Sequence, residues 1–385
     1  MRDFLVIGAG SAGSVIAAEL ARRQAGSVMV LEAGPSDEHP LVSMPMGLVW
    51  LMRSRREWQF KTTPQKEAGN RQINVPRGKM VGGSGSINSM VWFRGRRDDF
   101  DGWNISGWTF AEVEPAFQAV EKYLQPTQLA TAHPLTRGLA WIFADTTPTP
   151  EHESAGVFSF NLHKGRRNSA ARAFLHKRHD IELRTGCVVD RLLWAGNKAI
   201  GVVLDNGVEV KAAKGVVLAA GSIASPAILM RSGIGPKDHL ASLGIDVRQD
   251  LQEVGENLHD HPGIGLHFEG SGSGYGLEPR QWGTWALAPF NYVVRGKGPL
   301  ASPTVEGGMF FNARGTDDIP DVQSHFIPFH LAHQGPRFQM KSGYFADVCL
   351  CRPKSRGSLR LASSDPNQSP LIDLGLLRDE SDLNT

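Results

Sequence analysis

The strongest constraint on the fold lies at the start of the chain. The apolar residues 4–7 are followed at once by residues 8–13, which have the spacing Gly-x-Gly-x-x-Gly, and then by apolar residues at helical intervals. A second apolar run, residues 27–31, ends in Glu32. This order of strand, glycine turn, helix, strand and acid is typical of the unit that binds a dinucleotide at a parallel sheet. We therefore predict an α/β protein with a Rossmann-like, parallel-sheet domain.

Each part of this unit has a physical reason. Gly8 permits the tight turn, Gly10 lets a pyrophosphate approach the backbone, and Gly13 lets the helix pack closely on the strand. The free N–H groups and the positive dipole end of the helix then face the phosphates. Glu32 is placed to accept hydrogen bonds from ribose hydroxyls, which disfavours NADP. The unit alone does not distinguish FAD from NAD.

A second glycine-rich loop occupies residues 78–88 and ends in Asn88. Small side chains at residues 82–86 let the backbone lie against a flat or charged ligand. With the segments 221–235, 254–262 and 352–358, this loop resembles the ordered signatures of the glucose-methanol-choline (GMC) oxidoreductases, and the choline dehydrogenase-like subgroup in particular.

The resemblance implies FAD as the cofactor. Some members of the family attach the flavin through a His just before the loop Asn, and this chain has Ile87 there, so we expect non-covalent FAD. Val189 is expected to contact the adenine through its backbone. The residues that the resemblance places against FAD are Gly8, Gly10, Ser11, Ala12, Gly13, Glu32, Ala33, Gly34, Val81, Gly82, Gly83, Ser84, Asn88, Val91, Val189, Ala220 and Gly221.

The resemblance also implies two domains. The FAD-binding domain is expected to be discontinuous, and the remaining segments are expected to form a substrate or cap domain with an antiparallel sheet. The FAD-binding domain comprises residues 1–40, 75–100 and 180–262, and the cap domain comprises residues 41–74, 101–179 and 263–385. Within the cap, Thr109 and Glu112 form a capping-box pattern, and we interpret Trp103 and Trp108 as core residues.

The reaction implied by the family is alcohol oxidation, with hydride transfer to flavin N5 and oxygen or a quinone as the final acceptor. The family's catalytic base is a His in a His-Pro-x-Gly-Thr segment, which the printed sequence does not contain. We therefore expect a C-terminally truncated chain that also lacks the last part of its FAD-binding domain, has no assigned catalytic residue and shows no substantial turnover. His325 and His330 remain candidates for the substrate pocket, whereas His259 and His261 are expected to be structural.

Two alternatives stay open. The chain is either an FAD-dependent alcohol dehydrogenase or oxidase, or a non-catalytic, flavin-binding remnant of one. An NAD-dependent enzyme is a third possibility, which the second glycine loop disfavours. Flavin absorbance would exclude the third, and bleaching by an alcohol would support only the first.

Composition narrows the partners and the compartment. The net charge is +2, and no run of basic residues favours nucleic acid or a lipid surface. No stretch of about 20 apolar residues predicts a membrane span, and no signal peptide is evident. Three cysteines indicate a reducing, cytoplasmic setting. Cys349 and Cys351 are interpreted as small buried hydrophobes, and no metal site is expected. The oligomeric state is not predicted.

Overall fold

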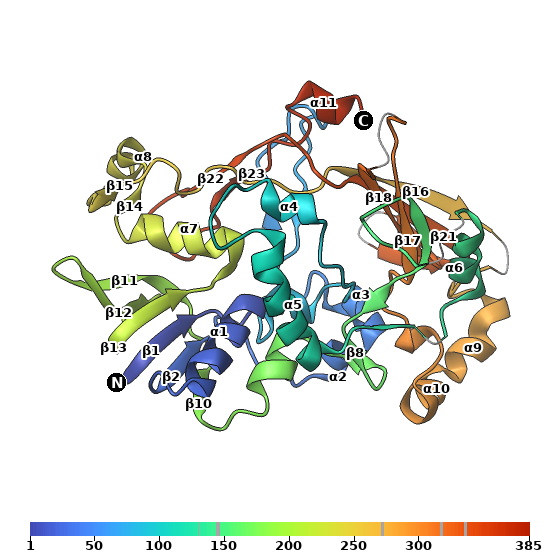
Figure 1. Cartoon of the computed structure of the whole chain (residues 1–385), viewed down its shortest axis with the longest axis horizontal. Coiled ribbons are helices and arrows are strands. Elements are labelled where there is room, and N and C mark those ends of the chain that lie inside the picture. Colours follow the sequence, from blue (N-terminus) through green and yellow to red (C-terminus); the bar gives the residue numbers. More distant parts are fainter. Residues whose placement is uncertain (130, 144–146, 271–272, 316–318, 335–336) are drawn as a thin grey trace.

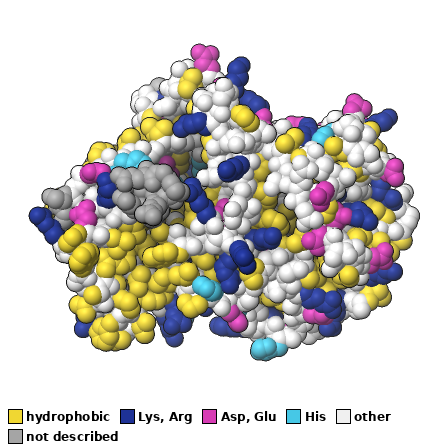
Figure 2. All heavy atoms as spheres, turned by 180° about the vertical axis from the view of Figure 1, so that it is seen from behind, with side chains coloured by type: hydrophobic (Ala, Val, Ile, Leu, Met, Phe, Trp, Pro, Cys, Tyr) yellow, Lys and Arg dark blue, Asp and Glu magenta, His cyan; other side chains and the backbone are white. Residues whose placement is uncertain are grey.

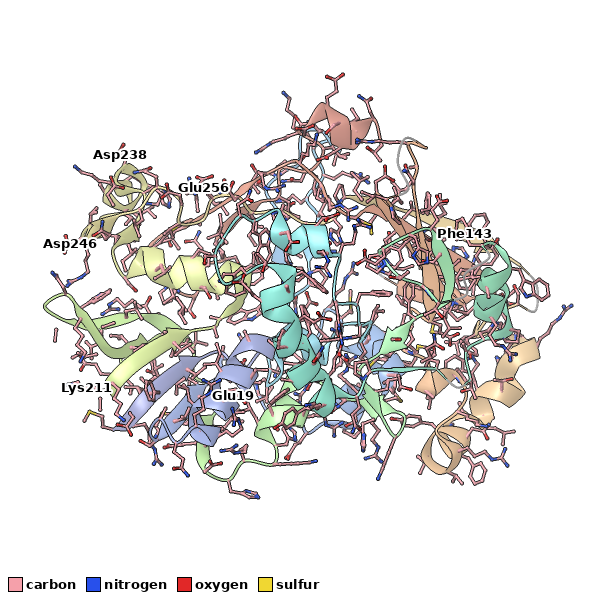
Figure 3. All side chains as sticks on the ribbon, in the orientation of Figure 1. Glu19, Phe143, Lys211, Asp238, Asp246 and Glu256 are labelled. Carbon is pink, nitrogen blue, oxygen red and sulfur yellow. The ribbon has the colours of Figure 1, made fainter. Side chains whose placement is uncertain are left out.

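The computed structural model describes residues 1–385 except 130, 144–146, 271–272, 316–318 and 335–336. Its two largest sheets have six and five strands and lie toward opposite ends of the long axis, with helix α5 (Phe110–Leu124) between them in the view of Figure 1. The labelled side chains in Figure 3 mark the same two ends: Lys211 lies beside the six-stranded sheet and Phe143 beside the five-stranded one.

The six-stranded sheet has the order β10-β2-β1-β13-β12-β11. Strand β1 pairs in parallel with both β2 and β13, and β10 pairs in parallel with β2. Strands β12 and β11 extend the sheet by antiparallel pairing. The predicted parallel sheet is therefore confirmed, with an antiparallel extension. Its strands are β1 (Arg2–Ile7), β2 (Val28–Leu31), β10 (Ile181–Arg184), β11 (Val189–Ala195), β12 (Lys198–Leu204) and β13 (Glu209–Leu218).

Strand β1 is apolar throughout because both of its faces are buried. Leu5 and Ile7 join a core that includes Ile228 of helix α7 (Gly221–Arg231), while Val6 joins another core with Ala17 of helix α1 (Ser11–Arg22). Side chains alternate between the two faces of a strand, so an uninterrupted apolar run suits a strand covered on both sides. The two helices are thereby held with their N-termini at the carboxyl end of the sheet.

The five-stranded sheet has the order β16-β21-β18-β17-β6 and is antiparallel throughout, as expected for the cap. The core on one side of it joins Phe158, Phe310 and Ile327 to Met90 and Phe93, which follow the second glycine loop. This sheet therefore packs against the segment that leaves the loop. Its strands are β6 (Ser154–Val157), β16 (Gly263–Glu269), β17 (Gly307–Phe311), β18 (Val322–Ile327) and β21 (Gly343–Leu350).

Short strand pairs and helices complete the fold. The short strands are β3 (Phe60–Lys61), β4 (Asn74–Val75), β5 (Thr127–Gln128), β7 (Ser159–Phe160), β8 (Leu162–His163), β9 (Arg166–Arg167), β14 (Ile234–Gly235), β15 (Gln249–Asp250), β19 (His330–Gln334), β20 (Arg337–Lys341), β22 (Ser358–Arg360) and β23 (Leu371–Asp373). The remaining α-helices are α2 (Pro40–Ser43), α3 (Leu48–Leu51), α4 (Arg97–Asp101), α6 (Pro134–Gly138), α8 (Lys237–Ser242), α9 (Trp282–Ala286), α10 (Ala288–Arg295) and α11 (Glu380–Leu383).

Residues from distant parts of the chain share one core beside α7. Phe60 and Val75 pack there with Met230 of α7 and with Leu359 and Ile372 of β22 and β23. The last strand pair therefore packs beside α7, and the predicted division into two domains remains a prediction.

Two local expectations have different outcomes. The capping box is confirmed, because the Thr109 N–H and hydroxyl both donate to Oε2 of Glu112, at 3.0 and 2.6 Å. The expectation that Trp103 and Trp108 are core residues is wrong, because each is 52% exposed. Their rings contact each other, with centroids 5.9 Å apart, so the two indoles cover one another at the surface.

Candidate functional site

A cavity of about 490 Å³ opens at the carboxyl ends of β1, β2 and β13. The carboxyl ends of the strands are where open α/β sheets bind their ligands. The first glycine turn, the residues that follow β2, the start of α7 and the second glycine loop form its wall. The residues predicted to contact FAD that line it are Gly8, Gly10, Ser11, Ala12, Glu32, Ala33, Gly83, Ser84, Val189, Ala220 and Gly221.

The three glycines of the first turn meet three different constraints. Gly8 has a φ of +96°, and a Cβ there would lie 2.6 Å from the Ala219 carbonyl oxygen. A Cβ on Gly13 would lie 2.0 Å from the Gly8 carbonyl oxygen, so this glycine lets α1 pack against the turn. A Cβ on Gly10 would meet no protein atom within 4 Å among the described residues. Gly10 therefore leaves open space where a ligand fits, whereas Gly8 and Gly13 allow other parts of the protein backbone to approach closely.

The second glycine loop is fastened directly to the first. The Gly82 N–H donates to the Ala9 carbonyl at 2.8 Å, and the Val81 N–H donates to the Pro35 carbonyl at 3.0 Å. A Cβ on Gly83 would lie 3.0 Å from Cα of Gly10, which brings the two backbones into contact beside the cavity. The turn at residues 8–13 and the loop at residues 78–88 therefore form one continuous wall.

Glu32 holds this wall together. Its Oε2 accepts the Ala9 N–H and its Oε1 accepts the Gly34 N–H, each at 2.9 Å. Burial raises the pKa of the Glu32 carboxyl, while these backbone hydrogen bonds act in the opposite direction. Each carboxylate oxygen has a second lone pair, so Glu32 is able to accept a ribose hydroxyl while it keeps both backbone contacts.

Two long helices begin at the cavity. Helix α1 and helix α7 both lack a side-chain hydrogen bond at the N-cap. Ser11 and Ala12 in the first turn of α1 are exposed, as are Gly221 and Ser222 in that of α7, and all four line the cavity. The first N–H groups of a helix have no partner within it and carry its positive dipole end, which suits the anionic groups of a pyrophosphate.

Other predicted cofactor residues lie behind the cavity wall. Gly34 accommodates the Lys79 carbonyl, to which a Cβ would come within 2.0 Å, and Val81 is buried in the core beneath α1. Asn88 and Val91 follow the second loop, and Val91 forms an isolated bridge with Phe160. The predicted residues that do not line the cavity are Gly13, Gly34, Val81, Gly82, Asn88 and Val91.

Arg167, at the end of β9, was missed by sequence reasoning. Its side chain is almost fully buried, and its Nε donates to the Val42 carbonyl at 3.1 Å. Its Nη1 donates to the carbonyl oxygens of Gly85 and Asn88, at 3.2 and 2.7 Å, and to Oδ1 of Asn88 at 2.8 Å. Burial lowers the pKa of Arg167 to about 9. No pattern in the sequence distinguishes this arginine from its neighbour Arg166.

Aromatic residues of the cavity wall were also missed. Trp58 and Phe60 line the cavity, and their rings stack with centroids 5.6 Å apart and planes 4° from parallel. Arg77 lines it as well. A flat aromatic surface suits a flat ring system, and alternation of aromatic residues at 58 and 60 was the available signal.

The two candidate histidines lie on successive strands of different sheets, His325 on β18 and His330 on β19, which pairs with β20. Nδ1 of His325 lies 3.5 Å from Oδ2 of Asp347, on the adjacent strand β21. Its ring meets Phe158 edge-on, with centroids 6.2 Å apart, and Phe158 in turn meets Phe93 at 5.0 Å. His330 is buried, with its ring centroid 5.0 Å from that of His267. His325 is thus connected through aromatic rings to the segment that follows the second glycine loop.

Cys187, Cys349 and Cys351 are free thiols, and burial raises the pKa of Cys349 to about 12 and that of Cys351 to about 11. Across the residues described, no group of three or more His, Cys, Asp or Glu side chains is arranged to hold a metal. No helix in this part of the chain has the length and apolar character needed to cross a membrane.

Comparisons with known proteins agree with this geometry. Residues 2–263 match the family model described as GMC oxidoreductase. The chain is 33% identical to the acceptor-type alcohol dehydrogenase of Pseudomonas putida, over 100% of this chain and 76% of that protein. It is 34% identical to the oxygen-dependent choline dehydrogenase of Sinorhizobium medicae, over 96% of this chain and 73% of that protein.

Solved structures show the same fold. Pyridoxine 4-oxidase from Mesorbium loti superposes with a TM-score of 0.85 at 26% identity, over 100% of this chain and 78% of that one. A formate oxidase superposes with a TM-score of 0.84 at 23% identity, over 99% of this chain and 78% of that one, and shows the shared fold alone.

The residues present fit FAD. The open space beside Gly10, the two uncapped helix starts and the acceptor Glu32 together provide for a pyrophosphate and a ribose. The family match and the oxidoreductase relatives agree with the two glycine loops in making FAD the cofactor. The chain belongs to the glucose-methanol-choline family of FAD-dependent oxidoreductases that act on alcohols.

Proposed function

We propose that this protein oxidises the carbinol carbon of a small alcohol, with FAD bound without a covalent link. The observation that carries the proposal is the single cavity at the strand ends, where two glycine loops and the N-termini of α1 and α7 converge. When bound, FAD supplies the N5 position that accepts a hydride from the substrate carbon.

The chain's own residues have distinct parts in holding the cofactor. Backbone N–H groups at the starts of α1 and α7 bind the pyrophosphate, Glu32 accepts from the ribose, and the backbone of Val189 borders the adenine. Gly83 and Ser84 continue this wall along the cofactor. Asn88 and Val91 are proposed to lie toward the isoalloxazine ring.

Ile87 supports the non-covalent attachment. Its side chain is buried with Val42, Leu51 and Met80, and a hydrocarbon offers no nucleophile for a bond to the flavin. Acid precipitation of the purified holoprotein should therefore release all of its FAD into the supernatant. Flavin that stays with the precipitate would contradict this part of the proposal.

His325 is the better supported of the two substrate-pocket candidates. It is linked by edge-on ring contacts through Phe158 and Phe93 to the segment after the second glycine loop, and Asp347 lies close enough to orient its imidazole. His330 lies on β19, which is outside the five-stranded sheet, and its ring is beside that of His267. We propose that His325 contacts the substrate hydroxyl and assign no catalytic base, because the printed sequence contains no His-Pro-x-Gly-Thr segment.

Anaerobic flavin reduction tests the function. The FAD-loaded chain is mixed without oxygen with choline, octanol, benzyl alcohol or pyridoxine, and the flavin absorbance is followed. Bleaching by one of them supports alcohol oxidation and names its class. Stable flavin absorbance that no alcohol bleaches would instead support the alternative, a flavin-binding protein without turnover.

The electron acceptor is tested in the same preparation. Reduced flavin is exposed either to dissolved oxygen or to a short-chain quinone, and the rate at which its absorbance returns is compared. Faster reoxidation by the quinone would indicate a dehydrogenase, and faster reoxidation by oxygen an oxidase.

A further inference from the structure

A second cleft, separate from the cofactor cavity, is lined by cations. It has a volume of about 1040 Å³ and lies between the end of α5, the β8–β9 hairpin, the residues after β9 and the end of α10. We define the basic cleft by the cationic side chains Lys122, Lys164, Arg166, Arg172, Lys177 and Arg295. No Asp or Glu is among the residues that line it.

These six charges are not neutralised by the protein. None of them forms an ion pair with a carboxylate in the described part of the chain. Many arginines outside the cleft do form such pairs. Uncompensated like charges repel one another and attract anions, so a cluster of this kind favours an anionic partner.

Helix α10 forms one wall of this cleft, and its large apolar side chains face outward instead of toward the protein. Ala288 is fully buried and faces the protein, while Leu287, Phe290, Val293 and Val294 are between 55 and 77% exposed. These four residues fall on one side of the helix, opposite Ala288, because successive residues are rotated by about 100°. The outward face of α10 is therefore its apolar face. Trp282 of the preceding helix α9 is also exposed.

The apolar face and the basic cleft are continuous. Val293, Val294 and Arg295 line the cleft together with Lys164 and Arg166. Figure 2 shows hydrophobic side chains gathered broadly over the end of the molecule that carries α9 and α10, with Lys and Arg side chains along the border of this patch. An exposed apolar surface of this kind normally has an occupant.

We propose that α10 and the basic cleft dock this protein onto an anionic phospholipid surface. Phosphate groups of the lipid occupy the cleft, and Phe290, Val293 and Val294 enter the boundary between headgroups and acyl chains. A helix that has apolar residues on one face, a Trp nearby and basic residues along its border is suited to lie in the plane of such an interface. With only eight residues, α10 lies on the bilayer and does not cross it.

A second copy of the chain fits this surface less well. Symmetric dimers bring the same patch of both partners together. The six unpaired cations at the border would then face their own copies, with no carboxylates in the cleft to offset the repulsion. An anionic lipid surface offers both negative headgroups for the cations of the cleft and a hydrocarbon region for the apolar side chains of α10.

Vesicle co-sedimentation tests the proposal directly. The FAD-loaded chain should sediment with vesicles of equal parts phosphatidylglycerol and phosphatidylcholine, and about tenfold less tightly with pure phosphatidylcholine. Binding to the anionic vesicles should weaken as salt is raised. Failure to sediment with anionic vesicles, or equal binding to neutral ones, would overturn the proposal.

Charge variants assign the binding to the cleft. Each basic side chain near an anionic surface strengthens binding roughly fivefold, so the combined change Lys164→Gln, Arg166→Gln and Arg295→Gln should weaken it about a hundredfold. The matched control is Arg55→Gln, Lys66→Gln and Lys237→Gln, which removes the same charge from exposed positions elsewhere and should leave binding within about twofold of the original. If both triple variants bind alike, the cleft is not the docking site.

Apolar variants separate lipid from the other possible partners. Val293→Ser with Val294→Ser should weaken vesicle binding roughly tenfold, whereas Ile105→Ser with Val208→Ser, at exposed positions elsewhere, should not. Glycerol phosphate that displaces the protein from vesicles at millimolar concentration would indicate a soluble anion site instead. A concentration-dependent dimer that Val293→Ser abolishes would indicate an interface between copies, and either result would contradict lipid docking.

Discussion

The buried guanidinium of Arg167 holds Asn88 at two points, donating from Nη1 to its carbonyl oxygen at 2.7 Å and to its side-chain oxygen at 2.8 Å. It also fixes Gly85 of the second glycine loop, and no carboxylate contacts it among the described residues. Since lysine has a compact ammonium in place of this planar fork, it does not reproduce the same set of contacts. Arg167 therefore positions the second glycine loop, which is proposed to approach the flavin.

Arg167→Met should disconnect this loop. The change leaves the acceptor oxygens of Gly85 and Asn88 without their buried donor, at a cost of about 2–4 kcal/mol in the free energy of unfolding. FAD should bind at least about tenfold more weakly, measured as quenching of flavin fluorescence on titration. The neighbouring exposed residue provides the control: Arg166→Met should leave both quantities nearly unchanged. Equal loss in the two variants would show that charge alone, and not the Arg167–Asn88 contact, is responsible.

Gly10→Ala should affect FAD binding without affecting stability, whereas Gly13→Ala should affect the stability of the protein itself. A Cβ on Gly10 meets open space, so the apoprotein should fold with an unchanged melting temperature but lose affinity for FAD, because the methyl group projects toward the pyrophosphate. A Cβ on Gly13 would collide with the Gly8 carbonyl at 2.0 Å, so that variant should lose soluble expression or melt well below the original. Thermal melting and FAD titration of both apoproteins check this. Retention of FAD by Gly10→Ala would place the cofactor elsewhere.

Glu32→Gln should weaken the join between the first glycine turn and the segment that follows β2. A glutamine side chain has one acceptor oxygen and one NH₂ group, so it no longer accepts from the N–H groups of both Ala9 and Gly34. One buried N–H is left without a partner, which costs about 1–3 kcal/mol. We expect a lower melting temperature and faster loss of FAD on dialysis. Glu38→Gln, at an exposed position six residues away, should show neither change.

His239 should make stability fall in mild acid. Its Nε2 accepts the Leu361 N–H at 3.1 Å, and burial, together with the nearby Arg360, lowers the pKa of the imidazole. Folding therefore favours the neutral ring, and this contribution is complete above the unfolded pKa of about 6.5. It is lost as pH falls from there through the lower folded pKa.

His239→Gln keeps an acceptor oxygen without a titrating ring. Its free energy of unfolding, measured by urea denaturation, should therefore decrease less between pH 7.5 and pH 5.5 than that of the original chain. His163→Gln, which changes an exposed imidazole, should retain the original slope. An unchanged slope in His239→Gln would assign the acid sensitivity to other groups.

The amino-acid sequence predicts best where the determinants are local. Strand β1, the turn from Gly8 to Gly13 and helix α1 follow one another directly, so their pattern carries the geometry. The antiparallel sheet that the family resemblance implied for the cap is also present, with β17 and β18 among its paired strands. The prediction that Trp103 and Trp108 are core residues was wrong because an aromatic residue indicates packing but does not identify its partner. Here the two rings pack on each other at the surface.

Long-range convergence accounts for what sequence reasoning missed. Arg167 is one of two adjacent arginines, and only the fold shows which of them turns inward to Asn88. The basic cleft contains Lys122, Lys164 and Arg295, which come from three distant segments of the chain, so no run of basic residues in the sequence predicts it. A net charge of +2 therefore gave no indication of a concentrated local cluster.

The position of β1 between β2 and β13 has a consequence for biosynthesis. The cavity proposed to hold the flavin is lined by residues from Ile7 to Ile228, so its last wall does not exist until α7 has left the ribosome. Until β13 has also been made, β1 has one neighbour in place of two, so one edge of this apolar strand stays unpaired. Cofactor binding therefore follows the synthesis of α7, and free FAD acts on a chain in which β1, β2 and β13 are already present.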